Sequence, residues 1–179
     1  ADWGADSVRC NIGGGSICST RIQTGHGMPG LQTIIECSRT DRDVSIIADG
    51  GIRNSGDVVK ALAAGADCVM VGSMLSATAE SPGVIHHLGN KQYKTYRGMA
   101  SEEAQQDWRG KASSLEGIST TVLYKGTVTR VLEQLDNGIR SGFSYTGART
   151  LAELQSRARF TRQTASGISE SKTHILDKK

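Results

Sequence analysis

The fold of this chain is constrained most by three short apolar runs that end in glycine. Two amphipathic helical patterns separate these runs. Residues 3–13 resemble residues 64–72, and each segment predicts a helix end, a short loop and a strand that stops at Gly. Residues 44–51 form a third β-rich run, which stops at Asp-Gly-Gly. Helical patterns at about 30–40 and 55–64 separate the runs. Strands that alternate with helices of this length predict parallel βαβ units.

The residues that end these runs favour one arrangement of the units. Gly, Cys, Asp and Ser follow the strand patterns, as in α/β barrels, whose chemistry lies at the carboxyl ends of the strands. We therefore predict an α/β fold of the (β/α)8 TIM-barrel type, with residues 1–179 as the C-terminal part of a single barrel domain, about its last three βα units. The chain begins at Ala1 rather than Met, which favours a truncated sequence. A complete small doubly wound sheet is the alternative.

The second half of the chain departs from the βα pattern. Residues 84–97 predict a hairpin, and residues 100–123 are polar and weakly periodic, which is the composition of a mobile flap. Apolar spacing predicts helices over about 127–140 and 150–161. The polar tail, residues 165–179, is expected to be flexible, or ordered only by a neighbouring subunit.

Local signals mark where some of these elements begin. Asn54 or Ser55 is the expected N-cap of the second helical pattern. Thr150 and Glu153 have the spacing of a capping box at the start of the last helix.

Composition and charge exclude several classes of function. The formal net charge is +3 and no basic run is interleaved with aromatic residues, so nucleic acid is not an expected partner. No apolar stretch approaches the roughly 20 residues that span a bilayer, and no signal peptide is visible, so no membrane is expected. Four cysteines without metal-ligand spacing favour a reducing, cytoplasmic compartment. Cys10, Cys37 and Cys68 lie in apolar runs and are expected in the core.

The loop over residues 13–21 carries the main candidate for chemistry. Its three consecutive glycines can turn backbone N–H groups toward an anion such as a phosphate. Cys18 follows after Ser16 and Ile17, and a thiolate there would be stabilised by Arg21 and by the glycine-rich loop. Thr20 could pass a proton if a carboxylate oriented it. A buried loop cysteine without a chemical role is the plainer interpretation, and its polar neighbours argue against it.

Polar residues at the ends of the other strands point to the same kind of ligand. Asp49 ends a buried strand, where its carboxylate needs hydrogen-bond partners, and either a ribose diol or a local turn would supply them. Ser73 ends the next strand, and Ser16 and Tyr96 could reach the same phosphate. Glu116 is the carboxylate of interest in the flap, although an isolated Glu is usually solvated.

Seven ordered motifs make the chain resemble a known enzyme family. They are Gly13–Arg21 (GGGSICSTR), Ile47–Ile52 (IADGGI), Val69–Leu75 (VMVGSML), Tyr96–Ser101 (YRGMAS), Tyr124–Gly126 (YKG), Gly138–Gly142 (GIRSG) and Tyr145–Ala148 (YTGA). They cover nearly the whole chain, in the order expected of the C-terminal half of the barrel in the IMP dehydrogenase / GMP reductase family.

The resemblance implies a role for each site residue. Cys18 would attack C2 of the purine ring of GMP or IMP, and Thr20 with Glu116 would transfer a proton. The residues implied to bind the nucleotide are Ser16, Asp49, Gly50, Gly51, Gly72, Ser73, Tyr96, Gly98, Met99, Ala100 and Gly117. NADPH, or NAD as the alternative, would contact Met99, Tyr145 and Gly147. A monovalent cation, K⁺ by the resemblance, would bind at Gly13, Gly15, Cys18 and Arg21, with the tail of a neighbouring subunit of a homotetramer near Glu170.

The two activities of the family divide on the flap. The dehydrogenases use an Arg-Tyr pair in a long flap to activate water, whereas here Asp107–Gly110 contains no such pair. Only 16 residues separate Met99 from Glu116, a short flap that is typical of the reductases. The resemblance therefore favours NADPH-dependent reductive deamination of GMP to IMP, with Thr20 and Glu116 protonating the departing ammonia.

Two other interpretations stay open. The segment Gly167–His174 resembles bacterial dehydrogenases, and Arg109 could activate water in an altered register, so oxidation of IMP to XMP with NAD is the alternative. A chain that binds nucleotide without turnover is a third, because three βα units cannot close an eight-stranded barrel.

Overall fold

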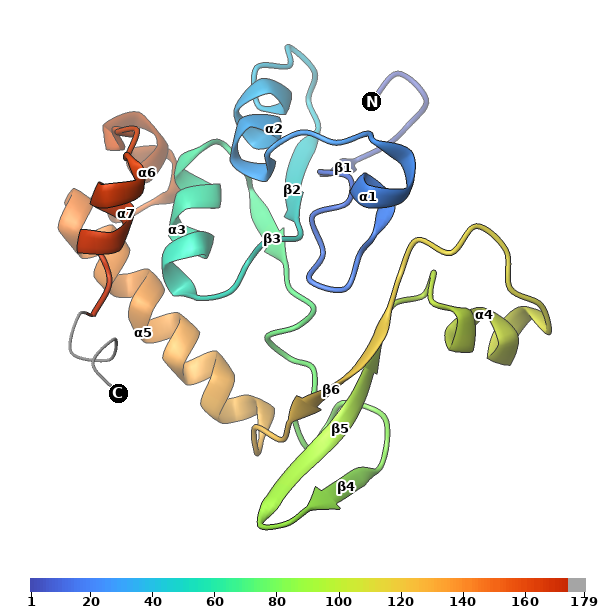
Figure 1. Ribbon diagram of the computed structural model, residues 1–179. Helices are drawn as coiled ribbons and strands as arrows, with labels where there is room; N and C mark the ends of the chain where they lie inside the picture. Colours follow the sequence, from blue (N-terminus) through green and yellow to red (C-terminus); the bar gives the residue numbers. More distant parts are fainter. Residues whose placement is uncertain (174–179) are drawn as a thin grey trace.

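A three-stranded parallel sheet forms the centre of the structure, a computed structural model that describes residues 1–173 (Figure 1). Strand β2 (Ser45–Asp49) lies between β1 (Ser7–Cys10) and β3 (Cys68–Met70). In the register, Cys10 lies opposite Ala48 and Asp49 opposite Met70, so all three strands end at one edge. The predicted parallel βαβ units are confirmed.

Two helices connect the strands and cover the sheet. Helix α2 (Gly30–Cys37) contributes Ile34, and helix α3 (Ser55–Ala63) contributes Val58, to a core that includes Ile46 of β2. Many other core residues are alanines, so the helices approach the sheet closely. The α3 helix begins at the predicted N-cap Asn54, whose side-chain oxygen accepts a hydrogen bond of 2.9 Å from the backbone N–H of Asp57.

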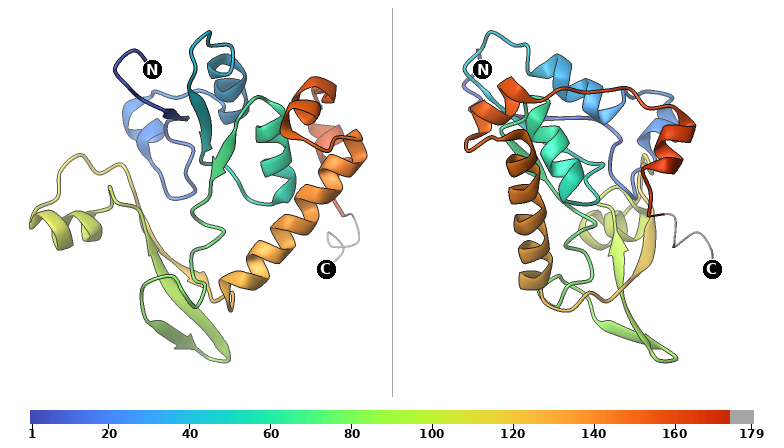
Figure 2. Two further views of the ribbon diagram at one scale, coloured as in Figure 1. Left: turned by 180° about the vertical axis from the view of Figure 1, so that it is seen from behind. Right: turned by 90° about the vertical axis from the view of Figure 1, so that its left-hand side faces the viewer.

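Two further helices pack on the outer side of α3. Helix α5 (Val128–Thr146) crosses α3, and α6 (Leu151–Arg157) follows it, with the Leu154 side chain fully buried (Figure 2). The predicted cap of α6 is confirmed, because the Thr150 hydroxyl accepts a hydrogen bond of 3.2 Å from the N–H of Glu153. Helix α5 extends beyond its predicted end to Gly147, which stops it with a left-handed backbone.

A second, antiparallel sheet projects away from the first (Figure 1). It consists of β4 (Ile85–Leu88), β5 (Lys91–Arg97) and β6 (Ser119–Leu123), in that order. The predicted hairpin is confirmed, with β4 and β5 joined at Gly89 and Asn90.

A buried lysine ties this second sheet to the segment that follows β3. Lys94 on β5 is only 3% exposed. Its ammonium group donates hydrogen bonds to the main-chain oxygens of Thr78 (2.9 Å), Ala79 (3.2 Å) and Ser81 (2.6 Å). These three acceptors replace the water that a buried ammonium group loses.

The expected flap contains regular structure that its polar composition did not predict. Helix α4 (Glu102–Arg109) begins at Ser101, whose hydroxyl accepts a hydrogen bond from the N–H of Ala104. An Arg97–Asp107 ion pair of 2.5 Å holds the helix against β5. Gln105 is buried and accepts a hydrogen bond of 2.8 Å from the N–H of Ser113. Polar contacts rather than an apolar face position this helix, which is why hydrophobic periodicity missed it.

Three other expectations differ from the structure. A short helix, α1 (Thr20–Thr24), begins inside the predicted glycine-rich loop. Another, α7 (Ala165–Glu170), lies in the tail that was expected to be flexible, and residues 174–179 of that tail lie outside the described residues. Cys68 is exposed rather than in the core, because β3 is an edge strand of the described sheet.

Packing of α5 against α3 depends on the absence of a side chain at Gly142. A Cβ atom there would lie 2.6 Å from Cγ2 of Val59, which is stiff because it is β-branched. We expect Gly142→Ala to lower the free energy of unfolding by about 1 kcal/mol, since overpacking exceeds the gain in helix propensity. Urea denaturation measures the change, with the exposed neighbour Ser141→Ala as the control. Adding Val59→Ala should recover part of the loss, and strictly additive losses would contradict this account.

Candidate active site

The loops that follow the parallel strands meet at the carboxyl edge of the sheet. The loop after β1 touches the loop after β2 at two glycines. A Cβ atom on Gly50 would lie 2.7 Å from the carbonyl carbon of Gly14, and the φ of Gly50 is 82°. Only glycine combines this backbone conformation with so close an approach. The two loops therefore form one continuous surface.

A cavity of about 300 Å³ opens between these loops and the loop after β3. Seven of the residues expected to bind the nucleotide line it, namely Ser16, Asp49, Gly50, Gly51, Gly72, Ser73 and Tyr96. The Tyr96 hydroxyl reaches the loop after β3, where a Cβ atom on Gly72 would lie 3.2 Å from it. The cavity thus combines hydroxyl groups, a carboxylate and glycine backbone, groups that suit a phosphate and a sugar diol.

Cys18 lies beside this cavity with its predicted partner. Its Sγ atom is 3.1 Å from Oγ1 of Thr20, and the backbone N–H of Cys18 donates to the carbonyl of Gly15 at 3.2 Å. Thr20 is the first residue of α1, so the start of this helix fixes the hydroxyl relative to the thiol. Both side chains are partly buried. The pairing predicted from the sequence places a hydroxyl where it can exchange a proton with the thiol.

The flap pairs with the cysteine loop through its backbone. Cys18 forms an isolated antiparallel bridge with Gly117, and the N–H of Ser19 donates to the carbonyl of Glu116 at 2.8 Å. The N–H of Ile118 donates to the carbonyl of Ile17 at 3.0 Å. Glu116, far from Cys18 in sequence, is therefore held beside it.

The side chain of Glu116 is less constrained than its backbone. Among the hydrogen bonds of residues 1–173, none joins the Glu116 carboxylate to the Thr20 hydroxyl. The structure brings the two residues to the same loop pair without joining them directly.

The residues expected near the base also gather here. A Cβ atom on Gly98 would lie 3.4 Å from Cδ1 of Ile17, and one on Gly117 would lie 3.0 Å from the N atom of Ser101 and 3.1 Å from the carbonyl carbon of Ala100. Met99 between them is 71% exposed. This segment therefore forms a close-packed wall on the flap side of Cys18, with one exposed thioether.

Asp49 has a partner that the sequence did not reveal. Nε of Arg9, on β1, lies 3.2 Å from Oδ2 of Asp49. Residue alternation along β1 places Arg9 and the buried Cys10 on opposite faces, but that pattern alone does not identify what Arg9 contacts. The ion pair orients the carboxylate that we expect to face a ribose.

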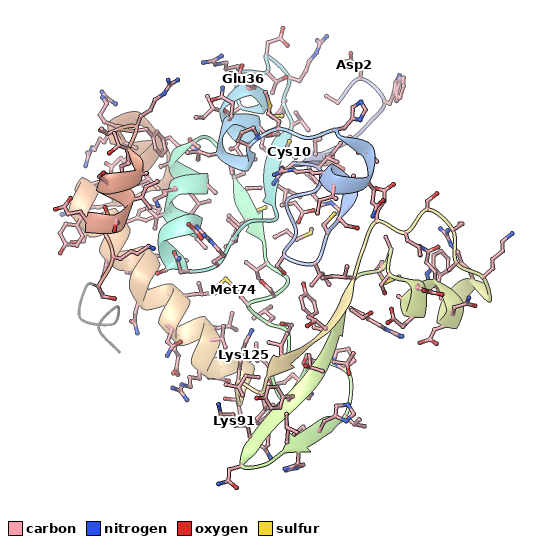
Figure 3. The ribbon with its side chains drawn as sticks, in the orientation of Figure 1. Asp2, Cys10, Glu36, Met74, Lys91 and Lys125 are labelled. Carbon is pink, nitrogen blue, oxygen red and sulfur yellow. The ribbon has the colours of Figure 1, made fainter. Side chains whose placement is uncertain are left out.

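A second missed residue, Lys125, anchors the backbone of the loop after β3. Its ammonium group donates to the main-chain oxygens of Ser73 and Met74, the latter at 3.2 Å, and Figure 3 shows Lys125 and Met74 where the parallel sheet meets the hairpin. Burial lowers the pKa of Lys125 below its ordinary value. Lys125 belongs to the Tyr124–Gly126 motif, but the motif alone does not predict these hydrogen bonds.

The residues expected to hold a monovalent cation do not form a cage by themselves. The Gly15 carbonyl already accepts the hydrogen bond from Cys18. Arg21 packs against Gly13, and its guanidinium donates to the carbonyls of Ile12 (3.0 Å) and Met28 (2.6 Å). A positive charge thus already lies in this loop without a bound cation.

The residues expected to bind the cofactor are not brought together within one chain. Met99 follows β5 beside Cys18, whereas Tyr145 and Gly147 lie at the far end of α5, across α3 from the site (Figure 1). Nineteen helical residues extend about 28 Å, so α5 carries its C-terminal end well away from the cavity. Tyr145 is 94% exposed.

The parallel βα units carry a cysteine beside a glycine-lined cavity at the carboxyl edge of the strands, as α/β enzymes of the barrel type do. Comparison with known proteins agrees. Residues 1–174 match the family model described as "IMP dehydrogenase / GMP reductase domain". The chain belongs to this family, and the predicted TIM-barrel fold class is confirmed.

Relatives of both kinds are similar to the chain. It is 45% identical to an inosine-5′-monophosphate dehydrogenase of Nitrosopumilus maritimus (strain SCM1), over 96% of this chain and 39% of that protein. A second, from Aquifex aeolicus (strain VF5), is 47% identical over 96% and 37%. Among solved structures, a cysteine-to-alanine variant of GMP reductase from Trypanosoma brucei, in complex with guanosine 5′-monophosphate, is similar with a TM-score of 0.92 and 42% identity over 97% and 37%.

The chain spans less than two fifths of the length of these relatives. None of the helices in residues 1–173 combines the length and the hydropathy that a membrane crossing requires.

The cysteines should differ in their reactivity. Burial, together with the neighbouring Cys37 thiol, raises the pKa of Cys10 to about 11 from an ordinary value of 9.0. At about pH 8 we expect iodoacetamide to modify Cys18 but not Cys10 in the folded protein, as measured by peptide mass spectrometry. Both should react in urea, and fast labelling of Cys10 without urea would contradict the structure.

Because the Cys10 thiol ionises at lower pH in the unfolded chain than in the folded one, the native state should lose stability as the pH rises from 9 toward 11.

Proposed function

We propose that the protein is a purine nucleotide oxidoreductase that converts GMP to IMP with NADPH, through a covalent adduct on Cys18. The proposal includes a full barrel, a homotetramer and a cytoplasmic location, as the family resemblance implies. Backbone pairing of Cys18 with Gly117 supports the covalent mechanism, because the main chain of Glu116 then lies beside Cys18 and Thr20. The choice of reaction rests on the short flap, with only 16 residues between Met99 and Glu116 and no Arg-Tyr pair at Asp107–Gly110.

The nucleotide would lie in the cavity with its phosphate at the loop after β3. Ser16, Ser73 and Tyr96 offer hydroxyl donors at that end, and the Asp49 carboxylate offers an acceptor for the ribose hydroxyls. This places the purine toward Cys18 and the wall formed by Gly98, Met99 and Ala100.

Covalent chemistry then follows from the thiol. The Cys18 thiolate adds to C2 of guanine, forming a carbon–sulfur bond, and the 2-amino group leaves as ammonia after it gains a proton. Thr20 lies 3.1 Å from Sγ and transfers that proton, with Glu116 as its source. Reduction of C2 requires a hydride, which a nicotinamide cofactor would supply when bound. Loss of the thiolate from C2 then yields IMP and restores Cys18.

One feature of the flap favours this reaction over water activation by Arg109. The Arg109 guanidinium stacks on the Trp108 ring, 4.1 Å from its centroid, at the C-terminal end of α4. Stacking engages the Arg109 guanidinium within the flap helix itself.

The second candidate is oxidation of IMP to XMP with NAD. The names of the curated relatives favour it, since the proteins from Nitrosopumilus maritimus and Aquifex aeolicus are both called inosine-5′-monophosphate dehydrogenase. The third candidate is nucleotide binding without turnover.

One assay separates the three candidates. The full natural protein is incubated with GMP and NADPH, then with IMP and NAD, while nicotinamide absorbance is followed. Loss of signal with GMP alone supports the reductase, and gain with IMP alone supports the dehydrogenase. No change with either, together with measurable GMP binding, supports the non-catalytic interpretation.

Cys18→Ala tests the nucleophile. We expect it to abolish turnover while GMP binds with nearly unchanged affinity in calorimetry, because the thiol reacts with the base but supplies little of the ground-state binding. Ser141→Ala, at an exposed residue of α5 outside the cavity, is the control and should keep full activity. Turnover retained by the Cys18 variant would refute the covalent mechanism.

Glu116→Gln tests the proton source. We expect kcat to fall roughly 10²-fold or more with little change in GMP affinity, the range for loss of a general acid. Glu102→Gln, on the exposed face of α4, is the control. An equal loss in both variants would indicate a general effect on the flap rather than a role for Glu116.

A further inference from the structure

Asn11, the first residue after β1, has an uncommon backbone conformation for a residue other than glycine. Its φ is 96°, in the left-handed region that most side chains avoid and that asparagine tolerates better than most. A sequence could relieve this by placing glycine there. The side chain of Asn11 must therefore contribute through its contacts.

Both polar atoms of the Asn11 side chain are used, and they join two loops. Nδ2 donates a hydrogen bond of 2.8 Å to the main-chain oxygen of Asp49, the last residue of β2, from which the next loop leaves. Oδ1 accepts one of 2.9 Å from Nη2 of Arg21, at the other end of the cysteine loop. Arg21 is fixed in turn by the carbonyls of Ile12 and Met28. Asn11 thus links the expected ribose loop to the cysteine loop.

Two glycines leave the space that this amide occupies. A Cβ atom on Gly14 would clash with Nδ2 of Asn11, and one on Gly30 would lie 3.0 Å from the same atom. Asn11 is partly buried, so water competes little for these hydrogen bonds.

Asp49 is consequently held at two points. Arg9 holds its carboxylate at 3.2 Å, and Asn11 holds its main-chain oxygen at 2.8 Å. The carboxylate can bind a ribose diol well only if its backbone stays in register with the loop that carries Cys18, because the two loops contact different parts of one nucleotide.

We infer that Asn11 is a positioning residue: it sets the ribose-binding residue Asp49 against the cysteine loop, without itself touching the nucleotide. The inference rests on the proposed binding of a purine nucleoside monophosphate. It specifies which part of that ligand should respond when Asn11 changes, namely the ribose hydroxyls.

Two variants separate the bridge from the backbone conformation. Asn11→Gly removes the amide and also relieves the strain of the left-handed backbone. We therefore expect it to weaken nucleotide binding without lowering the thermal unfolding midpoint to a matching extent. Asn11→Asp keeps an acceptor for Arg21 but replaces the donor to Asp49 with an oxygen atom. Asn90→Asp, the same chemical change at the exposed hairpin turn, is the matched control.

The measurement is equilibrium binding of GMP and of 2′,3′-dideoxy-GMP to the full natural protein. Wild type should prefer GMP, and both Asn11 variants should reduce that preference roughly three- to tenfold, the range for one lost hydrogen bond. Asn90→Asp should leave it unchanged.

Other results would overturn either the positioning role of Asn11 or the proposed function. Equal weakening of both ligands, or unchanged binding of both, would overturn the positioning role while leaving the proposed function intact. Failure of the wild-type protein to bind GMP would overturn the proposed function itself.

Discussion

Direct contact between Gly14 and Gly50 is the constraint on which the rest of the site depends. Two loops that leave neighbouring strands can share one cavity only if their backbones touch, and here neither position has room for a side chain. Asp49, Ser16 and Cys18 owe their mutual placement to this contact. The catalytic proposal therefore depends first on the absence of two side chains, and only then on the reactive groups.

Regular periodicity made much of the fold predictable. Alternation of strand and helix patterns over residues 1–72 predicted the parallel sheet, and the turn at Gly89 predicted the hairpin. The flap helix α4 was not predictable in the same way, because Arg97, Ser113 and Ser119 position it through polar contacts from elsewhere in the chain. Hydrophobic spacing carries no information about such contacts.

Some contacts of the candidate site were likewise predictable from the sequence, and others were not. Cys18 and Thr20 are two residues apart, so their contact could be anticipated, and the glycines marked the loops that form the cavity. Arg9 and Lys125 were missed as partners of Asp49 and Ser73, because each partner lies far away in sequence. For Lys125 the acceptor is also a main-chain oxygen, which every residue type offers. Tyr145 was assigned to the same cofactor as Met99, yet the length of α5 separates them in a single chain.

The two lysines that grip the segment after β3 have an evolutionary consequence. Lys94 and Lys125 bond only to main-chain oxygens of residues 73–81, which every amino acid possesses. Substitution of a side chain in that segment therefore leaves these hydrogen bonds intact, whereas substitution of either lysine removes them. The path of this backbone is protected against changes in its own sequence but not against changes at Lys94 or Lys125.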